Sequence, residues 1–244
     1  MKSKAKVVVI GGGVVGVSML YHLAKKGWSD VALIERKELT SGSTWHAAGL
    51  LPLFNMGYAT THLHDYSVEF YKSLEAETGL NAGFSVVGNL RMAQTKERMD
   101  EYMLYGSTAE TLGIEYQKLT PNQIKERWPL IRTDDLAGAI YHPTDGYINP
   151  ADVTMAMAKG ARQMGVSIER KWQVDGYQWN GNEWKVTCTK MIEKGNIQVS
   201  DIHNVAYFLY GNKKGIPVLI LHGGPGAGSF HYEARFFNPK KFFI

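Results

Sequence analysis

The sequence predicts an α/β fold organised around a parallel β-sheet. Within residues 7–35, an apolar strand is followed by a glycine-rich turn, an amphipathic helix and a second apolar strand, which is the pattern of a βαβ unit. Further predicted strands and helices alternate over much of the chain, with capping and turn residues between them. The 244 residues are enough for one large domain or two small ones.

A glycine-rich loop joins the first strand to the first helix. Gly11, Gly13 and Gly16 have the spacing G-x-G-x-x-G. In this pattern the first glycine permits a tight turn, the second lets the backbone approach a pyrophosphate, and the third lets the helix pack on the strand. Val14 and Val15 open the helix, whose positive N-terminal end would face the phosphates. Gly27 can take the left-handed conformation that ends this helix. The loop therefore predicts a site for an adenine dinucleotide, and the alternative is a glycine-rich turn without a ligand.

The second strand ends in an acid that completes this unit. Val31–Ile34 is apolar, and Glu35 follows at the place where an acid accepts a hydrogen bond from a ribose hydroxyl. Arg36 comes next and counts among the candidate binding residues. The unit does not distinguish FAD from NAD, so the motif alone leaves both dinucleotides open.

The composition is that of an ordinary globular protein. Hydrophobic residues make up 44% and charged residues 20% of the chain, and the formal net charge is +4. This small, interspersed charge gives no indication of nucleic-acid or membrane binding, and the apolar run after the basic start Met1–Lys6 is too short for a signal peptide or a membrane span. The single cysteine, Cys188, excludes an intrachain disulfide and suits a reducing compartment, so we expect a cytoplasmic protein.

A segment of small residues follows the first βαβ unit. Ser43 or Thr44 can cap a short helix here, and the small side chains would let a flat ligand lie against the backbone. The stretch Gly-Ser-Thr-Trp-His-Ala-Ala-Gly at 42–49 resembles the flavin segment of the dimethylglycine and sarcosine dehydrogenases, which belong to the D-amino-acid-oxidase-like group of FAD enzymes. The resemblance covers about residues 5–190 and implies that the dinucleotide is FAD.

The resemblance also implies roles for individual residues. In covalent members of the family, a histidine of this segment is bonded to the 8α carbon of the flavin, which implies attachment at His46; other relatives hold FAD without this bond. On residue type alone, His46 would be a surface or hydrogen-bonding histidine. Family members contact adenine through the backbone at the position that matches Val174. Beyond the glycine loop, Glu35 and Arg36, the candidate FAD-binding residues are Ser43, Thr44, Trp45, His46, Ala47, Ala48 and Val174.

The middle of the chain predicts an α+β region, which the resemblance identifies as part of a substrate domain. The predicted elements are helices at 60–78, 96–112 and 121–128 and strands at 84–94, 114–119 and 136–142. Thr95 is a suitable cap for the helix at 96–112, and Thr120 and Gln123 have the spacing of a capping box. His62, His64 and Asp65 lie at a helix start and would need a further ligand to hold a metal, so we expect solvated side chains there and no metal site.

The next stretch also resembles the same family, in which it returns the chain to the FAD-binding domain. Residues 145–150 read Asp-Gly-Tyr-Ile-Asn-Pro and match the family stretch Asp-Gly-Tyr-x-Asn-Pro. Asn149 is a suitable cap for a helix that begins at Pro150 and runs to Met164. A strand over 166–169 and a β-hairpin follow, with hairpin strands at 171–179 and 183–189 and Asn-Gly in the turn.

The end of the chain resembles a second family. From about residue 197, and above all at Ile216–Gly226, the sequence is similar to the N-terminal part of proline iminopeptidases, which have the α/β-hydrolase fold. In that family the loop helps to form an oxyanion hole, which implies a remnant of that loop at His222, Gly223, Gly224, Pro225 and Gly226. A plain glycine-rich turn is the alternative. The chain has no G-x-S-x-G motif and hence no nucleophile elbow, and the apolar strand at 218–221 would lack a partner sheet.

Together these observations predict a Rossmann-like FAD-binding domain with part of an inserted α+β substrate domain, followed by a truncated α/β-hydrolase N-terminal segment. Residues 1–195 would be the oxidoreductase region, with FAD-binding parts at 1–60 and 143–190 and a partial substrate domain at 61–142, and residues 196–244 the hydrolase-like fragment. By resemblance, the parent activity is oxidative demethylation of small N-methylated amines such as dimethylglycine or sarcosine. A serine-hydrolase fragment and a non-catalytic hybrid fragment are the alternatives, and catalytic residues stay unassigned.

Overall fold

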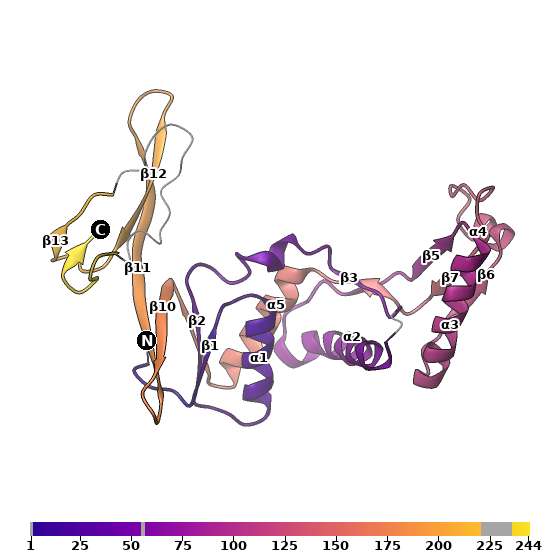
Figure 1. The fold of residues 1–244 in the computed structure, drawn as a ribbon, viewed down its shortest axis with the longest axis horizontal. Helices are drawn as coiled ribbons and strands as arrows, with labels where there is room; N and C mark the ends of the chain where they lie inside the picture. Colours follow the sequence, from indigo (N-terminus) through magenta and orange to yellow (C-terminus); the bar gives the residue numbers. More distant parts are fainter. Residues whose placement is uncertain (1, 55–56, 221–235) are drawn as a thin grey trace. The chain divides into compact units, whose positions relative to one another are not determined.

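The computed structural model describes residues 2–54, 57–220 and 236–244. It divides into two compact units that each contain their own sheets. Unit 1 consists of Met1–Ser43 and Ala161–Ile244, and unit 2 of Thr44–Gly160. Figure 1 shows how the chain leaves unit 1 after β2, builds unit 2 and returns through α5.

A three-stranded parallel sheet with the order β1-β2-β9 forms the centre of unit 1. Its strands are β1 (Val7–Ile10), β2 (Val31–Glu35) and β9 (Ser167–Arg170). Helix α1 (Val14–Lys25) connects β1 to β2 and buries Val17 and Leu20 completely. The predicted strand, turn, helix and strand are confirmed, and Gly27 takes the left-handed conformation, with φ +85°, directly after the helix.

A second, antiparallel sheet of unit 1 has the order β10-β11-β12. Its strands are β10 (Trp172–Trp179), β11 (Trp184–Gln198) and β12 (Asn204–Tyr210). The predicted hairpin is present, and Asn180 Oδ1 accepts hydrogen bonds from the turn N–H groups of Asn182 and Glu183. The predicted end of the second hairpin strand at residue 189 is wrong, because β11 continues to Gln198. Its added length is paired with β12, a partner that local periodicity does not reveal.

The last described residues, 236–244, pair with the segment that follows β12. β13 (Ile216–Pro217) and β14 (Phe242–Phe243) form a short parallel pair, and the Val218 N–H donates to the Phe243 carbonyl at 2.8 Å. The strand predicted at 218–221 is wrong for the residues described, because β13 ends at Pro217 and residues 218–220 are not in a strand. The predicted oxyanion loop at 222–226 lies outside the described residues.

Unit 2 contains a small antiparallel sheet with the order β3-β8-β4. Its strands are β3 (Leu50–Leu51), β8 (Gly146–Tyr147) and β4 (Ser85–Val86). The central strand needs a glycine, because a Cβ on Gly146 would lie 2.1 Å from the carbonyl oxygen of Ser85. The single strand predicted at 84–94 is wrong: β4 pairs with β8, whereas β5 (Asn89–Ala93) joins a different sheet. Gly88, with φ +77°, lies at the break between them.

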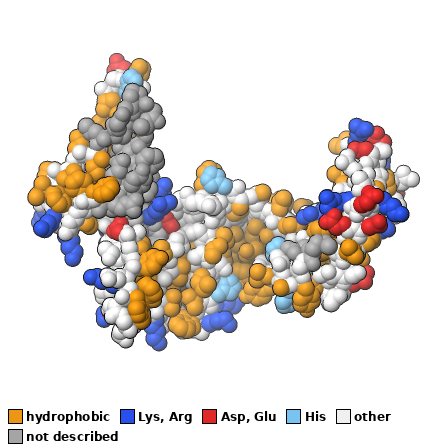
Figure 2. All heavy atoms as spheres, in the orientation of Figure 1, with side chains coloured by type: hydrophobic (Ala, Val, Ile, Leu, Met, Phe, Trp, Pro, Cys, Tyr) orange, Lys and Arg blue, Asp and Glu red, His pale blue; other side chains and the backbone are white. Residues whose placement is uncertain are grey.

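Among its described residues, unit 2 also contains a second sheet and several α-helices. The sheet has the order β5-β7-β6, and its other strands are β7 (Gly138–His142) and β6 (Gln117–Leu119). The helices are α2 (Tyr58–Thr78), α3 (Lys96–Leu112), α4 (Pro121–Arg127) and α5 (Pro150–Gln163), of which α5 crosses into unit 1. Figure 2 shows acidic and basic side chains mixed over the end of unit 2 that carries α3 and α4, as expected of solvated helix faces.

The predicted helix caps of unit 2 are confirmed. Thr95 accepts a hydrogen bond from the N–H of Arg98 at the start of α3. At α4, Thr120 and Gln123 form the reciprocal capping box. These contacts join residues three apart in the chain, so the sequence contains all the information they need.

Replacing Gly146 with alanine is expected to destabilise unit 2 by about 3 kcal/mol, because the new Cβ would force β8 away from β4. The loss should appear in chemical denaturation followed by helical circular dichroism. Gly176→Ala is the matched control: its Cβ would meet no atom within 4 Å, so a change below about 0.5 kcal/mol is expected. Equal losses in the two variants would contradict the steric argument.

Candidate functional site

The glycine loop of unit 1 holds two backbone segments in close contact. Gly11 has φ +108°, and its N–H donates to the Ile34 carbonyl at 2.9 Å. A Cβ on Gly16 would lie only 2.0 Å from the Gly11 carbonyl oxygen. Gly11 is therefore favoured by its left-handed backbone, and Gly16 by the close contact, because a side chain on Gly16 would push α1 off the end of β1.

The N-terminus of α1 is open to an anion. Gly13 is the N-cap residue, with extended backbone, and it supplies no side-chain cap; the first turn contains no acidic residue. The positive end of the helix dipole therefore has no negatively charged side chain within the first turn. Val15, at 78% exposure, lies in this turn. This is the arrangement that binds the phosphates of a dinucleotide.

Glu35 lies against the glycine loop. Its Oε2 accepts a hydrogen bond from the Gly12 N–H, and its Oε1 accepts one from the Lys37 N–H, both at 2.7 Å. A carboxylate has about four acceptor positions, so these bonds orient Glu35 and leave acceptor capacity for a ribose hydroxyl. The sequence indicated the acid but not its anchor on the loop.

Two further residues of this loop were missed by the sequence analysis. Gly12 has no space for a side chain, because a Cβ there would lie 2.6 Å from Leu39 and 2.9 Å from Glu35. Thr40 has φ +67°, a rare conformation for a β-branched residue, and its N–H donates to the Gly12 carbonyl at 2.9 Å. Three consecutive glycines were the available signal for Gly12, whereas nothing local indicated Thr40.

The predicted flavin segment forms a short 3₁₀ helix over Ser43–His46. Thr44 is buried, whereas Trp45 and His46 are exposed, and their rings lie against each other with centroids 3.8 Å apart. Ala47 and Ala48 follow and are also exposed. The segment therefore presents an imidazole and small side chains to its surroundings, as a residue that bonds to a flat ring requires.

The other predicted site residues have different environments. Arg36 lies close enough to Tyr210 for its charge to act on the tyrosine pKa, which burial raises. Val174 is half-buried in β10, pairs with Cys188 and lies beside a β-bulge that ends at Gly176. Partial burial of the Cys188 thiol, and the nearby Asp175 charge, raise its pKa, which argues against a reactive thiol.

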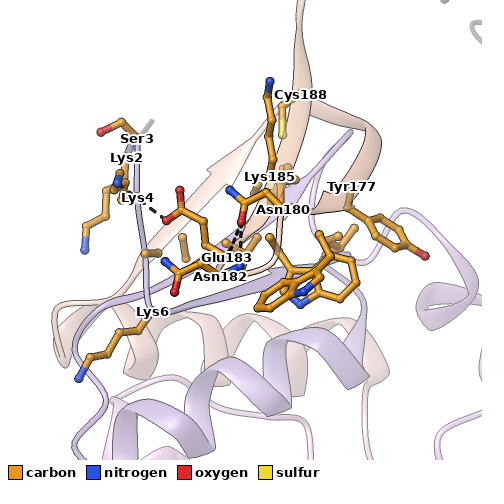
Figure 3. A pocket seen from close by; sticks show the side chains of 18 residues that line it. Lys2, Ser3, Lys4, Lys6, Tyr177, Asn180, Asn182, Glu183, Lys185 and Cys188 are labelled. Carbon is orange, nitrogen blue, oxygen red and sulfur yellow. Dashed lines mark hydrogen bonds and ion pairs between the residues drawn. The ribbon is translucent and has the colours of Figure 1, made fainter.

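A cleft of about 830 Å³ lies elsewhere in unit 1, between the N-terminal arm, the β1–β2 sheet and the β10–β11 hairpin. Figure 3 shows its lysine-lined rim, including Lys4, which pairs with Glu183 at 3.8 Å. Its wall includes the exposed rings of Tyr177, Trp179 and Trp184. None of the motif glycines, Glu35 or the flavin segment lines this cleft, so it is separate from the candidate dinucleotide site.

Comparison with known proteins identifies the family. The model of the family "FAD dependent oxidoreductase" matches residues 6–203. This chain belongs to that family. Its cofactor is FAD, which decides between the two dinucleotides that the glycine motif left open.

Individual relatives agree with this assignment. The chain is 45% identical over 168 residues to the mitochondrial dimethylglycine dehydrogenase of Rattus norvegicus, which covers 69% of this chain and 20% of that protein. It is 37% identical over 209 residues to the mitochondrial sarcosine dehydrogenase of Homo sapiens, covering 84% and 23%. The chain thus spans only about a fifth to a quarter of these relatives.

The fold is that of a solved amino-acid dehydrogenase. The structure of L-proline dehydrogenase from P. horikoshii superposes with a TM-score of 0.72 at 30% identity and covers 77% of this chain and 50% of that one. This confirms the mixed α/β oxidoreductase fold. Since the family match extends to residue 203, it also passes the expected boundary at 195.

The residues of this oxidoreductase fit FAD at the places described. The Gly11–Gly16 cradle has no room for side chains at its contact, and α1 presents its positive end without an acid in the first turn. Metal binding has no comparable support: within residues 2–54, 57–220 and 236–244, no three His, Cys, Asp or Glu side chains gather as metal ligands. In the same part of the chain, no helix combines the length and apolar character needed to cross a membrane.

Unit 2 contains a buried cluster of titratable groups that the sequence analysis did not find. His142 Nε2 lies 3.1 Å from the Tyr105 hydroxyl, and the Tyr105 O–H lies 3.2 Å from the Leu53 carbonyl, to which it donates. Because the Tyr105 hydroxyl donates to Leu53, it accepts from His142, and the proton of neutral His142 is therefore on Nε2. The Leu53 N–H donates to Asp145 Oδ1 at 3.0 Å. Asp145 and His142 are 1% and 0% exposed.

Burial shifts the pKa values of these groups strongly. It raises the pKa of Asp145 to about 6, although the Leu53 N–H and the Arg91 charge act in the opposite direction. Burial also lowers the pKa of His142 to about 4, and the Arg91 charge lowers it further. The pKa of Tyr105 is raised by burial and then by the Asp145 charge. Each group is therefore driven toward its neutral form.

The pKa shifts of Asp145 and His142 oppose each other in their effect on stability. Between about pH 4 and pH 6, folded Asp145 retains a proton that the unfolded chain releases, so this group's contribution falls as the pH rises. Between about pH 6.5 and pH 4, unfolded His142 takes up a proton that the folded state excludes, so its contribution falls as the pH drops. Over the shared range the two contributions largely cancel.

Single substitutions should expose the two opposed slopes. Relative to the unchanged protein, Asp145→Asn is expected to gain about 2 kcal/mol in the free energy of unfolding as the pH rises from about 4 to about 6.5, because the variant lacks the charge that becomes buried. His142→Gln should lose a similar amount over the same range. Urea denaturation at several pH values measures both differences. Parallel slopes in the two variants would contradict the assigned protonation states.

Proposed function

We propose that this chain forms part of an FAD-dependent oxidoreductase that oxidises a small N-methylated amine, such as dimethylglycine or sarcosine. Membership of the family over residues 6–203 supports the reaction class. The relatives named dimethylglycine dehydrogenase and sarcosine dehydrogenase support the substrate class. When bound, FAD supplies the two-electron acceptor for oxidation of the amine, whose imine product would hydrolyse and release formaldehyde.

The observation that carries the proposal is the glycine cradle at the start of α1. A Cβ on Gly16 would collide with the Gly11 carbonyl, and the helix that begins after Gly13 has no acidic residue in its first turn. The cradle would therefore hold the pyrophosphate of FAD through backbone N–H groups. Glu35, oriented by the Gly12 N–H, would accept a hydrogen bond from the ribose. Val174 is proposed to contact adenine through its backbone, and Arg36 to lie at the edge of the same site.

The segment Ser43–Ala48 would hold the flavin end of the cofactor. His46 is the proposed attachment point, since its imidazole is exposed and is held against the Trp45 ring. An unprotonated imidazole nitrogen is the nucleophile that such a bond requires. We assign no catalytic residue within this chain, and the electron acceptor that reoxidises the flavin stays open.

The proposed assignment of residues to the FAD-binding and substrate domains is the one that the sequence predicts. Residues 1–60 and 143–190 would supply the FAD-binding parts, and residues 61–142 part of the substrate domain.

The cytoplasmic location rests on the single cysteine and stays a prediction, and relatives named mitochondrial point to a different compartment for those proteins. The hydrolase resemblance of residues 196–244 has no support from the relatives named above and also stays a prediction.

Substituting alanine for Gly16 should abolish retention of FAD, because its Cβ would collide with the Gly11 carbonyl and displace the N-terminus of α1. Purified protein should lose the flavin absorption band, with the FAD-to-protein ratio falling at least tenfold. Met19→Ala changes an exposed side chain of the same helix and should retain the FAD of the unchanged protein. Full FAD content in the Gly16 variant would contradict the proposed cradle.

The His46→Ala variant separates attachment from binding. The unchanged protein is expected to stay yellow after acid precipitation, whereas the variant should bind FAD and release it into the acid supernatant. His62→Ala, at an exposed position on the helix that follows, is the matched control and should leave the acid-stable colour intact. Colourless protein after expression with ample flavin would contradict the oxidoreductase proposal, and hydrolysis of a proline arylamide by that protein would favour the hydrolase alternative.

A further inference from the structure

Both backbone polar groups of Leu53 are bound by side chains from distant parts of unit 2. Its N–H donates to Asp145 Oδ1 at 3.0 Å, and its carbonyl accepts from the Tyr105 hydroxyl at 3.2 Å. Leu53 is 4% exposed, so neither group has ready access to water, and each requires a partner within the protein. Asp145 and Tyr105 therefore fix the main chain at this position from both sides.

The contact with Asp145 ends a continuous line of backbone pairing. The Ile148 N–H donates to the Gly49 carbonyl at 2.8 Å, and β3 then pairs Leu50 with Tyr147 and Leu51 with Gly146. Leu53 and Asp145 follow in the same antiparallel direction. Residues 49–53 are thus bound along 145–148, and this bound stretch begins three residues after His46.

We propose that Asp145 is a positioning residue, which fixes residues 49–54 through Leu53 and so sets the place at which the flavin segment begins. The inference rests on the proposed function only in assigning His46 to the flavin; the fixing of the backbone stands independently. The Asp145 backbone has a second attachment, since its carbonyl accepts from the N–H groups of Val87 and Gly88. The residue is therefore held by its main chain while its side chain holds Leu53.

Several buried polar atoms around Asp145 are unfavourable for stability, which favours a role for this cluster beyond stability. The Asp145 Oδ2, His142 Nδ1 and Arg91 Nε atoms are buried and have no hydrogen-bond partner among the described residues, which is costly for any fold. Arg91 also lies over the Phe54 ring, 4.3 Å from its centroid. The titratable and charged groups of this cluster come from several parts of unit 2. Arg91 lies on β5, Tyr105 on α3 and His142 on β7, and Asp145 lies between β7 and β8. Tyr116, between α3 and β6, acts on Tyr105.

The first arm of the test requires no cofactor. Asp145→Ala removes the acceptor of the Leu53 N–H, whereas Asp145→Asn retains a carbonyl oxygen at the same place. In hydrogen-exchange measurements resolved to short peptides, we expect protection of residues 49–54 to fall at least tenfold in the alanine variant and less than threefold in the asparagine variant. Protection of β5 and β7 should stay unchanged in both, and Asp100→Ala, an exposed position on α3, is the matched control.

The second arm of the test measures how much flavin stays attached to the protein after acid treatment. In protein expressed with ample FAD, the acid-stable flavin fraction should fall at least fivefold in Asp145→Ala and return to at least half of the original value in Asp145→Asn. A role in general stability alone would not give this rescue while leaving β5 and β7 protected. If the unchanged protein binds no flavin, the proposed function fails, and the exchange measurement still decides whether Asp145 positions residues 49–54.

Two outcomes would overturn the inference. One is unchanged exchange of residues 49–54 in Asp145→Ala. The other is equal loss in the alanine and asparagine variants, because the proposed role belongs to the acceptor oxygen. Should Asp145→Ala not fold, Tyr105→Phe removes the opposite contact to Leu53 and retains the ring, and exchange of the same residues should then rise at least threefold; no change there would equally contradict the proposal.

Discussion

Three backbone crossings, each too close for a side chain, determine the geometry on which the candidate site depends. A Cβ on Gly16 would lie 2.0 Å from the Gly11 carbonyl, one on Gly49 would lie 2.0 Å from the Ile148 carbonyl, and one on Gly146 would lie 2.1 Å from the Ser85 carbonyl. The first crossing sets the N-terminal end of α1, at the proposed phosphate site. The other two, both within unit 2, set the path of the chain on either side of β8, and hence the stretch that follows the flavin segment.

Local signals were sufficient to predict much of the fold. The caps at Thr95 and Thr120, the helix end at Gly27 and the hairpin turn after Asn180 each involve residues two to four apart, and the structure confirms them. The failures involve distant partners. β11 runs past its predicted end because β12 pairs with it, and the strand predicted at 84–94 divides because its two parts join different sheets.

The same distinction applies to the candidate site. Gly11, Gly13, Gly16 and Glu35 could be found because a phosphate-binding turn and its acid have fixed spacing in sequence. Thr40 could not, since its strained backbone follows from a hydrogen bond to Gly12 far back in the chain. The buried cluster around His142 was invisible for a related reason: its groups come from widely separated elements, and each of them alone has the ordinary signature of a loop or core residue.

The stretch 145–150 shows how a short motif can serve several physical tasks at once. Asn149 caps α5 by accepting from the N–H groups of Ala151 and Asp152, which the sequence predicted. Gly146 permits the close approach of β4, and Asp145 holds Leu53. A buried carboxyl with an unpaired oxygen is an expensive way to satisfy one backbone N–H, because a water-exposed turn would satisfy it without desolvating the acid. Its presence is physically reasonable if the exact position of residues 49–54 matters more than the stability lost, and the opposed titrations of Asp145 and His142 then keep their summed contribution to the free energy of unfolding almost independent of pH between about 4 and 6.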